Sequence, residues 1–389
     1  MKKIIFLCEL LPFHTISGRP WFLAQALKKK GLSPIFFGLS PNPLKYFNEK
    51  KYNPQKFLEI FKINRYYKEE IKFYSLPRYL PLRYVILHKF YNSLIIPQLF
   101  FSKFKNLCEG AIIYTQNPVW FWVIKKLKNN IIIYDRIDDL KVFFPLLKTK
   151  IFFEKIEENL IKKATIIFSI CKNIEKEIKK KYPQAKVINL PNAVPEEWCN
   201  INNQKVEYSS LFSSQSFYFE RPVIGFVGSL FWWIDFDLIE KCLQKFPKAT
   251  FLFVGPYKED IKKLLQYKNL FLLGPRPYSL IPYYIDFFDV CILPFKKDEV
   301  AYKSDPIKIY EYLALGKPVV STPIGTSDEN LNELVYFSQN DEEFIININK
   351  ALKENNSSLK EKRKKYIFKN HTWEKRAETF IKTISFLED

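Results

Sequence analysis

Glu311 is the residue whose type and position suggest chemistry most directly. It is expected in the second turn of a helix, one turn beyond free amide groups that, with the helix dipole, attract anions. A carboxylate at that place is well positioned to accept hydrogen bonds from the vicinal hydroxyls of a ribose. Phosphate at the helix start and sugar hydroxyls on Glu311 together indicate a nucleotide-sugar site. The alternative is an amphipathic helix with Glu311 on its solvated face.

The residues around Glu311 predict the helix that positions it. Asp305 and Pro306 form a start signal, in which a side-chain acceptor at the N-cap precedes a proline where no amide donor is needed. Gly316 supplies a left-handed C-cap, and a buried strand is expected over residues 319–321. Apolar residues recur between these ends at helical spacing, at Ile307, Ile309, Tyr310, Leu313 and Ala314.

A second group of candidate residues follows a strand expected over residues 131–134. Asp135, Asp138 and Asp139 come directly after this strand. Open α/β sheets bind ligands at the carboxyl ends of their strands, so the acidic cluster is a candidate wall of a site. Alternatively, Asp138 and Asp139 cap the next helix.

Strands and helices alternate in both halves of the chain, which predicts an α/β fold with parallel sheets. We expect residues 1–195 to form a Rossmann-like domain, 196–221 a linker, 222–371 a second Rossmann-like domain and 372–389 a C-terminal helix. Residues 41–110 give no regular pattern. Helices are predicted at 19–30, 119–128, 152–163, 173–181, 235–246, 258–266 and 281–287, with strands between them.

The charge of the chain is large and uneven. The net charge is +20, and residues 1–108 hold 19 Lys and Arg against 5 Asp and Glu, a balance of +14. A basic first third suggests an anionic partner, which could be a membrane surface, nucleic acid or polyphosphate. The alternative is a basic surface that reflects biased composition alone.

The cysteines and the apolar runs bear on the cellular compartment. The six cysteines are scattered without a CxxC pair, so we expect reduced thiols of a cytosolic protein. Three histidines without clustered ligands give no metal site. The apolar run before Glu9 is too short for a signal peptide, and no run of about 20 apolar residues predicts a membrane span.

Short motifs at predicted strand ends and loops follow one another through both halves. In the first half they are Gly18-Arg19-Pro20 with Leu23-Ala24, Tyr134-Asp135 with Asp138-Asp139, and Pro191-Asn192-Ala193-Val194. In the second half they are Gly225-Phe226-Val227-Gly228 with residues 232–235, Val254-Gly255-Pro256, Leu273-Gly274 with Pro277-Tyr278, Phe288-Asp289-Val290 with Pro294-Phe295, and the run from Glu311 to Val320.

In order and spacing these motifs resemble the retaining, family 4-like glycosyltransferases of the GT-B fold. The likeness covers nearly the whole chain and is nearest to the branch of teichuronic-acid and related surface-polysaccharide glycosyltransferases of bacteria. It implies two Rossmann-like domains facing across a cleft, with the C-terminal helix crossing back to the first domain. Glu311 matches the second glutamate of the family's donor-site motif, and residues 313–320 match the AxGxPVV run that follows it.

The resemblance implies a role for each matched residue. Glu311 would bind the donor ribose, the backbone from Gly274 to Arg276 would contact the base, and Gly228 would let the backbone approach the diphosphate. The candidate sites are catalytic Asp135, Lys308 and Arg19; donor-binding Glu311, Gly228, Ser229, Gly274, Arg276, Ile307 and Lys308; and acceptor-side Gly18, Arg19, Asp138 and Asp139.

The chain departs from the family pattern at three places. Lys303 stands where the first glutamate of the motif is expected, and Ser229 stands where many relatives place an arginine. Asp135 and Arg136 occupy the strand end where many relatives carry a histidine. The diphosphate charge must therefore be met differently, and we expect Lys308 to meet it, with Arg19 from the other domain. The alternative for Lys308 is a solvated helix residue.

We therefore expect a metal-independent, retaining glycosyltransferase without a cofactor, moving a sugar from a nucleotide-sugar to a glycan or lipid-linked acceptor in surface polysaccharide biosynthesis. In such enzymes the departing phosphate is thought to help deprotonate the acceptor. The alternatives are a nucleotide-sugar epimerase or phosphorylase on the same fold and, from another class, a nucleic-acid-binding protein, for which no module is recognisable. We expect no nucleic-acid partner.

Basic and aromatic residues interleaved from Tyr66 to Phe104 predict a cytoplasmic protein held on the inner face of the membrane.

Overall fold

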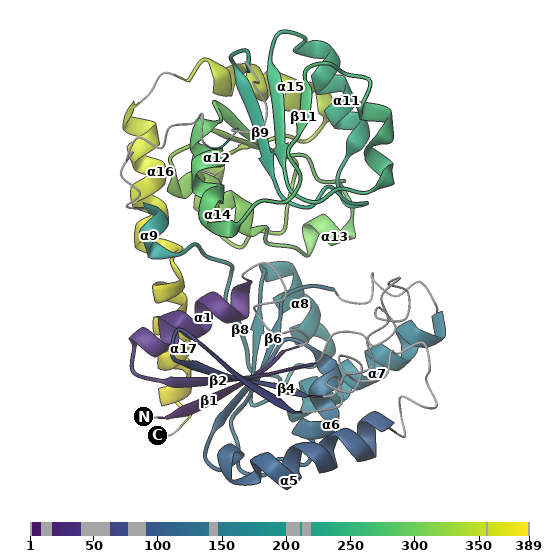
Figure 1. Ribbon diagram of the computed structural model, residues 1–389, viewed down its shortest axis with the longest axis vertical. Coiled ribbons are helices and arrows are strands. Elements are labelled where there is room, and N and C mark those ends of the chain that lie inside the picture. Colours follow the sequence, from purple (N-terminus) through teal and green to yellow (C-terminus); the bar gives the residue numbers. More distant parts are fainter. Residues whose placement is uncertain are drawn as a thin grey trace. The chain divides into compact units, whose positions relative to one another are not determined.

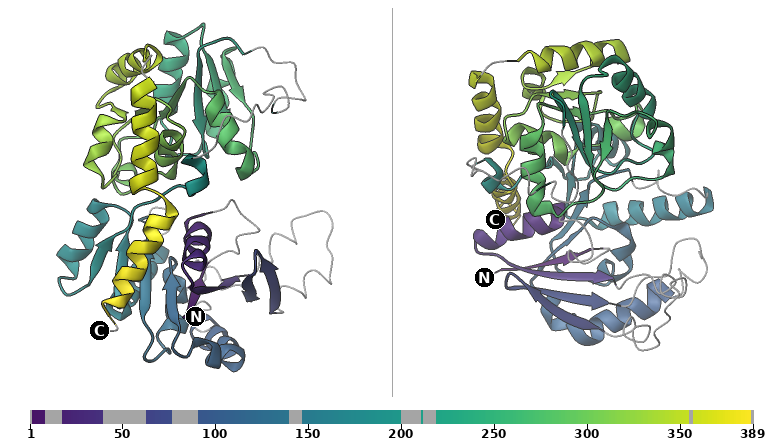
Figure 2. Two further views of the ribbon diagram at one scale, coloured as in Figure 1. Left: turned by 90° about the vertical axis from the view of Figure 1, so that its left-hand side faces the viewer. Right: turned by 45° about the horizontal axis from the view of Figure 1, so that its top comes forward.

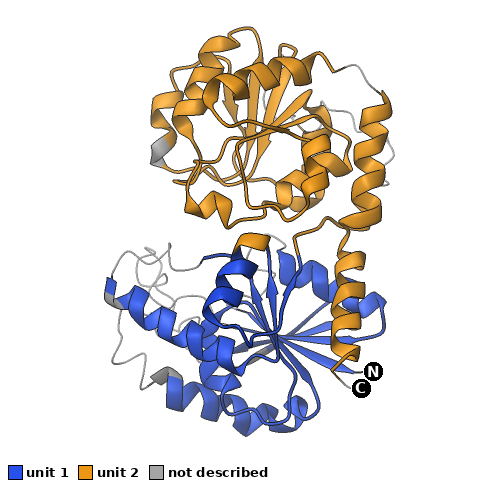
Figure 3. Cartoon of the chain, turned by 180° about the vertical axis from the view of Figure 1, so that it is seen from behind, with its two compact units in different colours: residues 1–170, 174–190 blue, residues 171–173, 191–389 orange. Residues whose placement is uncertain are grey.

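The computed structural model of the 389-residue chain describes residues 2–8, 18–39, 63–76, 91–139, 147–199, 211, 219–354 and 357–387. The chain divides into two compact units (Figure 3). Unit 1 comprises Met1–Ile170 and Ile174–Leu190, and unit 2 comprises Cys171–Asn173 and Pro191–Asp389. Most of the predicted linker lies outside the described residues. So do Tyr79, Tyr84 and Phe90, three aromatic residues of the segment from Tyr66 to Phe104 that was predicted to bind the membrane.

Unit 1 is built on an eight-stranded sheet in the order β3-β4-β2-β1-β5-β6-β7-β8 (Figure 1). Every neighbouring pair is parallel except β3 and β4, which are antiparallel. The central strands are continuous apolar runs because helices flank the sheet (Figure 2). The strands are β1 Lys3–Leu7, β2 Ser33–Leu39, β3 Asn64–Lys68, β4 Ile71–Leu76, β5 Ile112–Thr115, β6 Ile132–Arg136, β7 Ile166–Ser169 and β8 Val187–Asn189.

The helical segments of unit 1 are α1 Arg19–Lys29, η1 Tyr91–Ile95, α5 Ile96–Cys108, η2 Pro118–Trp120, α6 Phe121–Ile124, α7 Leu147–Lys163 and α8 Lys172–Lys181. The single helix predicted over residues 119–128 is wrong. Asn117 caps a short 3₁₀ turn by accepting from the Val119 amide at 3.0 Å, and α6 ends after four residues. Residues 64–76, which gave no sequence pattern, form the β3–β4 hairpin, whose turn residues Glu69 and Glu70 have positive φ.

Unit 2 contains a six-stranded, all-parallel sheet in the order β11-β10-β9-β12-β13-β14. Its strands are β9 Val223–Val227, β10 Thr250–Val254, β11 Leu270–Leu272, β12 Val290–Leu293, β13 Val319–Ser321 and β14 Tyr336–Phe337. Its helical segments are α9 Glu196–Cys199, α11 Phe236–Lys245, η4 Glu259–Leu264, η5 Tyr278–Leu280, α12 Ile281–Phe287, α13 Glu299–Tyr302, α14 Ile307–Ala314, η6 Glu329–Glu333, α15 Asp341–Leu352, α16 Ser357–Asn370 and α17 Trp373–Ser385. The segment predicted as a helix over 258–266 is the 3₁₀ helix η4. The mixed α/β fold with two parallel sheets is as predicted.

The start of α14 differs from the prediction. Pro306 is the N-cap residue, and Asp305 does not cap the helix. The buried Asp305 carboxylate instead accepts from the Asn192 amide at 2.6 Å and from the Tyr310 hydroxyl at 2.7 Å. The end of the helix is as predicted, because Gly316 has a φ of 74°. Asp305 therefore joins α14 to a segment 113 residues earlier in the chain.

The cysteines are free thiols, and all six are buried. Burial raises the pKa of Cys8, Cys108, Cys199 and Cys242 to about 12. Within the described ranges, no helix combines the length and the apolarity that crossing a membrane requires.

Three glycines join the carboxyl ends of neighbouring strands in unit 2. The Gly228 amide donates to Val254 O and the Gly255 amide to Gly274 O, each at 2.9 Å. A Cβ atom on Gly255 would lie 1.9 Å from the carbonyl oxygen of Gly228. Because this neighbour is backbone, it cannot turn aside as a side chain could.

Replacing Gly255 by alanine should lower the free energy of unfolding by about 3 kcal/mol, from the backbone clash and from a φ of 147°. The matched control is Gly31→Ala, which also has a positive φ but nothing within 4 Å of the added Cβ, and should cost about 1 kcal/mol. Urea unfolding of both variants measures the difference. Equal losses would show that the close approach to Gly228 does not constrain the fold.

Candidate functional site

The carboxyl edge of the unit 2 sheet has a point where the strand order reverses. From β9 the chain adds β10 and β11 on one side, and then returns to add β12, β13 and β14 on the other. Ligands of open α/β sheets bind at such a point, outside the carboxyl ends of the strands. Gly228 and Ser229 follow β9, and α14 is the second helix after β12. Gly228, Ser229 and the predicted donor-binding residues of α14 therefore belong to elements that flank this reversal, whereas Gly274 and Arg276 follow the edge strand β11.

Helix α14 is fixed against the end of β9 by Tyr312. The Tyr312 side chain is fully buried, and its hydroxyl oxygen accepts from the Val227 amide at 2.8 Å. The same hydroxyl donates to Val227 O at 3.4 Å. Because Tyr312 follows Glu311 directly, this contact also determines where the glutamate lies. Sequence analysis did not identify Tyr312, whose partner is 85 residues away.

Glu311 is fully buried, which excludes the alternative of a solvated helix face. Its Oε1 accepts a hydrogen bond from the Tyr278 hydroxyl at 3.1 Å, and its Oε2 accepts one from Lys308 Nζ at 2.6 Å. A carboxylate that has left water needs a cation and hydrogen-bond donors to remain charged. Lys308 and Tyr278 supply both, so the site holds a carboxylate ready to accept hydrogen bonds.

Tyr278 is a site residue that sequence analysis did not identify as one. Burial and the neighbouring Glu311 carboxylate raise the pKa of Tyr278 well above its ordinary value, so the hydroxyl stays protonated and donates. Its ring packs against Trp198, with 5.2 Å between the ring centroids, and Lys308 Nζ lies 6.0 Å from its centroid. The Pro277-Tyr278 pair in the sequence marked the segment but gave no indication of the contact with Glu311.

The other predicted donor residues lie on loops of unit 2. Gly274 follows β11 with a φ of 67°. Arg276 is exposed, and its Nε donates to the Tyr284 hydroxyl at 3.2 Å. Ile307 and Lys308 begin α14, where no acidic side chain lies in the first turn. Lys303, at the position of the missing motif glutamate, pairs with Glu299 of α13.

In unit 1 the structure brings together two residues that were predicted separately. Arg19 Nε lies 2.7 Å from Asp135 Oδ2, Arg19 Nη2 lies 3.0 Å from Oδ1, and both side chains are buried. Arg19 also donates to Leu190 O at 2.7 Å, and the Tyr114 hydroxyl donates to Asp135. Gly18 is the N-cap of α1 and places Arg19 in the first turn. This pair joins α1 to the carboxyl ends of β5 and β6.

Asp138 and Asp139 are partly buried beyond the end of β6. Burial, and then the charge of Asp139, raise the pKa of Asp138 to about 7. The next described helix, α7, begins at Leu147, and residues 140–146 between them lie outside the described part of the chain. Asp138 is thus a carboxyl group that exchanges its proton near neutral pH.

The raised pKa of Asp138 predicts a pH-dependent stability. Between about pH 4 and pH 7 the folded state holds a proton that the unfolded chain releases, so this group's contribution to stability falls as the pH rises through that window. Asp138→Asn should therefore raise Tm at pH 8, and raise it less at pH 5. Thermal unfolding at both pH values measures this.

The control for Asp138 is Asp237→Asn in the exposed pair with Lys263, which lowers the pKa of Asp237. That variant should not gain stability at pH 8. An Asp138→Asn variant with the same change in Tm at both pH values would contradict the assignment.

Comparisons with known proteins place this geometry in context. Residues 221–354 match the family model for glycosyl transferases group 1. The chain is 28% identical over 226 residues to Bacillus subtilis TuaH, named as a teichuronic acid biosynthesis glycosyltransferase. That match spans 56% of this chain and 56% of TuaH, so the chain matches little more than half the length of this relative.

Solved structures match over the whole chain. Sucrose-phosphate synthase from Thermosynechococcus elongatus has a TM-score of 0.70 at 13% identity, covering 100% of this chain and 99% of that one. A Burkholderia vietnamiensis UDP-forming trehalose-phosphate synthase has a TM-score of 0.69 at 11% identity, with coverage of 100% and 99%. An Escherichia coli trehalose-6-phosphate structure bound with UDP-2-fluoro glucose has a TM-score of 0.68 at 14% identity, covering 98% of each chain. The chain therefore has the GT-B fold, and residues 221–354 of its second unit are similar to the glycosyl transferases group 1 family.

Proposed function

We propose that the protein is a retaining, metal-independent glycosyltransferase that moves a sugar from a nucleotide-sugar to a glycan or lipid-linked acceptor in bacterial surface polysaccharide biosynthesis. The observation that carries the proposal is the buried Glu311 carboxylate, held by Lys308 and Tyr278 on the helix that follows the strand-order reversal. The group 1 match over residues 221–354 and the likeness to TuaH support the reaction class.

In the proposed reaction, unit 2 holds the donor. Glu311 accepts hydrogen bonds from the ribose hydroxyls, and the backbone from Gly274 to Arg276 contacts the base. Gly228 and Ser229 lie beside the diphosphate. The Ile307 amide and the Lys308 ammonium stabilise the negative charge of the departing phosphate, which is electrostatic catalysis by donors already in place.

For the acceptor, the proposed binding residues are Gly18, Asp138 and Asp139 of unit 1. The departing phosphate takes the proton of the acceptor hydroxyl, so the reaction needs no strong side-chain base. Arg19 and Asp135 act here through their buried ion pair, which fixes the start of α1 to the sheet. Their mutual pairing disfavours the epimerase alternative, because an epimerase needs acid and base groups free to exchange protons with the substrate.

The deciding experiment is binding and turnover with a panel of UDP-, GDP- and ADP-sugars, with and without excess EDTA. One nucleotide-sugar should raise Tm and be consumed, and EDTA should not reduce turnover. Loss of activity in EDTA that manganese restores would contradict metal independence. Epimerised nucleotide-sugar without transfer would favour the epimerase instead.

Glu311→Gln should weaken donor binding by about 1.5–3 kcal/mol, because a hydrogen bond from ribose to a charged acceptor becomes one to a neutral amide. This corresponds to a rise in KM or Kd of roughly tenfold to more than a hundredfold. Donor titration with the variant measures it. Turnover at the wild-type rate and KM would refute the donor-site assignment.

We also propose that the protein binds the cytoplasmic face of the membrane through unit 1. Support comes from the exposed residues of η1, α5, α6 and the start of α7, hereafter the basic face. These segments contact one another in sequence, and Figure 1 labels the three helices. Phe100 and Phe104 of α5 are buried in the core, but other apolar side chains of the basic face are exposed: Leu94, Leu99, Leu147 and Ile151. Exposed lysines accompany them at Lys103, Lys105, Lys125, Lys126 and Lys150. Each lysine near an anionic surface contributes about 1 kcal/mol to binding.

The protein should co-sediment with anionic vesicles at low salt and be released at high salt. Lys103→Glu combined with Lys105→Glu should reduce binding several-fold. The matched control combines Lys176→Glu with Lys180→Glu on α8, which makes the same charge change on exposed residues of another helix. No co-sedimentation at low salt, or an equal loss in both double variants, would contradict binding through the basic face.

A further inference from the structure

Lys308 binds Oε2 of Glu311, the carboxylate that the proposed ribose contact uses. Its Nζ lies 2.6 Å from Glu311 Oε2, while the Tyr278 hydroxyl occupies Oε1 at 3.1 Å. Because Glu311 is fully buried, a ribose hydroxyl reaches Oε2 only when a covering group moves aside, and the partly exposed Lys308 is the partner on that atom. Since the lysine and the glutamate are three residues apart on one helix, the pair forms within α14 itself.

Breaking this pair has a cost that a nucleoside alone does not offset. Glu311 is fully buried, and a buried carboxylate that loses its cation is left with uncompensated charge. A neutral hydroxyl restores the hydrogen bond but not the positive charge. The displaced ammonium group therefore needs to remain close, and it gains a new partner only if the ligand brings a negative charge.

The position of Lys308 allows that second partner. Its side chain is about one-fifth exposed, in contrast to the fully buried Glu311, and a lysine has a flexible four-carbon stem. Lys308 is the second residue of α14, so its ammonium group can reach the space before the first turn, where the helix dipole also favours an anion. Ser229, which follows Gly228 after β9, is uncharged, so a phosphate beside it would depend on a cation from another segment.

We propose that Lys308 is an exchange residue that couples recognition of the ribose to recognition of the diphosphate. The ribose hydroxyls replace its ammonium group on Glu311, and the released ammonium group binds the diphosphate of the donor. Tyr278 stays on Oε1 as a positioning residue that orients the carboxylate in both states. The inference rests on the proposed function, since it assumes a nucleotide-sugar on α14.

The exchange predicts a specific pattern of affinities. A nucleoside diphosphate satisfies both Glu311 and Lys308, whereas the nucleoside alone displaces the lysine without giving it a partner. The probes are three pairs, each a diphosphate with its nucleoside: UDP with uridine, GDP with guanosine, and ADP with adenosine. The pair that binds the wild type most tightly is then used for the variants. The wild type should bind that diphosphate at least a hundredfold more tightly than the nucleoside.

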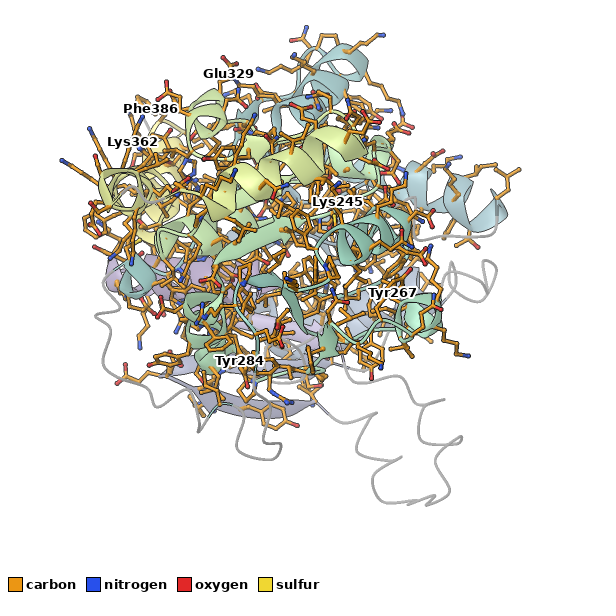
Figure 4. The ribbon with its side chains drawn as sticks, turned by 90° about the horizontal axis from the view of Figure 1, so that it is seen from above. Lys245, Tyr267, Tyr284, Glu329, Lys362 and Phe386 are labelled. Atoms are coloured by element: carbon orange, nitrogen blue, oxygen red, sulfur yellow. The ribbon has the colours of Figure 1, made fainter. Side chains whose placement is uncertain are left out.

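Lys308→Gln should weaken the diphosphate at least tenfold while leaving nucleoside affinity unchanged or increased, because no ammonium group has to be displaced. Lys308→Arg should retain most of the wild-type ratio. Tyr278→Phe should weaken both ligands by a similar factor. The matched control is Lys362→Gln, which breaks the 2.8 Å surface pair with Glu333 and should change neither affinity (Figure 4).

Two outcomes would overturn the exchange. In one, Lys308→Gln weakens the diphosphate and the nucleoside equally, which is what a lysine that only holds Glu311 would do. In the other, Lys308→Gln changes neither affinity. If Lys308→Gln does not fold, the double variant Lys308→Gln with Glu311→Gln removes both charges together, and a wild-type ratio in that protein also overturns the exchange. If no diphosphate binds the wild type, the proposed function fails, and the exchange fails with it.

Discussion

A carboxylate that leaves water has to be given positive charge and hydrogen-bond donors, and much of this structure is arranged around that requirement. In unit 1 the Arg19 guanidinium binds the buried Asp135, and Arg136 lies 3.0 Å from both Glu157 and Glu177. In unit 2 Lys308 serves Glu311 in the same way, and Arg363 serves Glu354 with a 2.8 Å hydrogen bond between Nη2 and Oε2. Most of these pairs join a helix to a strand or to another helix, so they determine which elements lie side by side.

Glu311 differs from the other members of this group in the kind of cation it has. Arg19 and Arg136 hold their carboxylates through several nitrogen atoms of a planar group. Lys308 offers a single ammonium group on a flexible stem, and its side chain is partly exposed. A carboxylate held in this way has a cation beside it in the absence of ligand but can change partners. The arginine pairs are suited to architecture, and the lysine pair is suited to binding.

Sequence analysis recovered the features that depend on neighbouring residues. Apart from β3 and β4, the strands of both sheets are mainly apolar runs, and Gly316 ends α14 because a residue tolerant of positive φ is needed there. It did not recover features that depend on distant partners. Asp305 looks like an N-cap, yet its carboxylate binds Asn192, 113 residues away. The pairing of Arg19 with Asp135 spans 116 residues, and the hydroxyl of Tyr278 reaches Glu311 from another segment. The β3–β4 hairpin was missed because its strands carry exposed polar residues that hide the usual apolar alternation.

The six buried thiols allow local unfolding of the chain to be detected by thiol modification. Cys8 directly follows β1 and Cys108 ends α5 in unit 1, while Cys242 lies in α11 and Cys291 in β12 of unit 2. Burial raises the pKa of these thiols, and a thiol-reactive reagent needs an accessible thiolate. Each cysteine therefore becomes reactive only when its own segment opens to solvent. Mapping the modified positions against time would rank the local stability of the two units in the unaltered chain, with no introduced label.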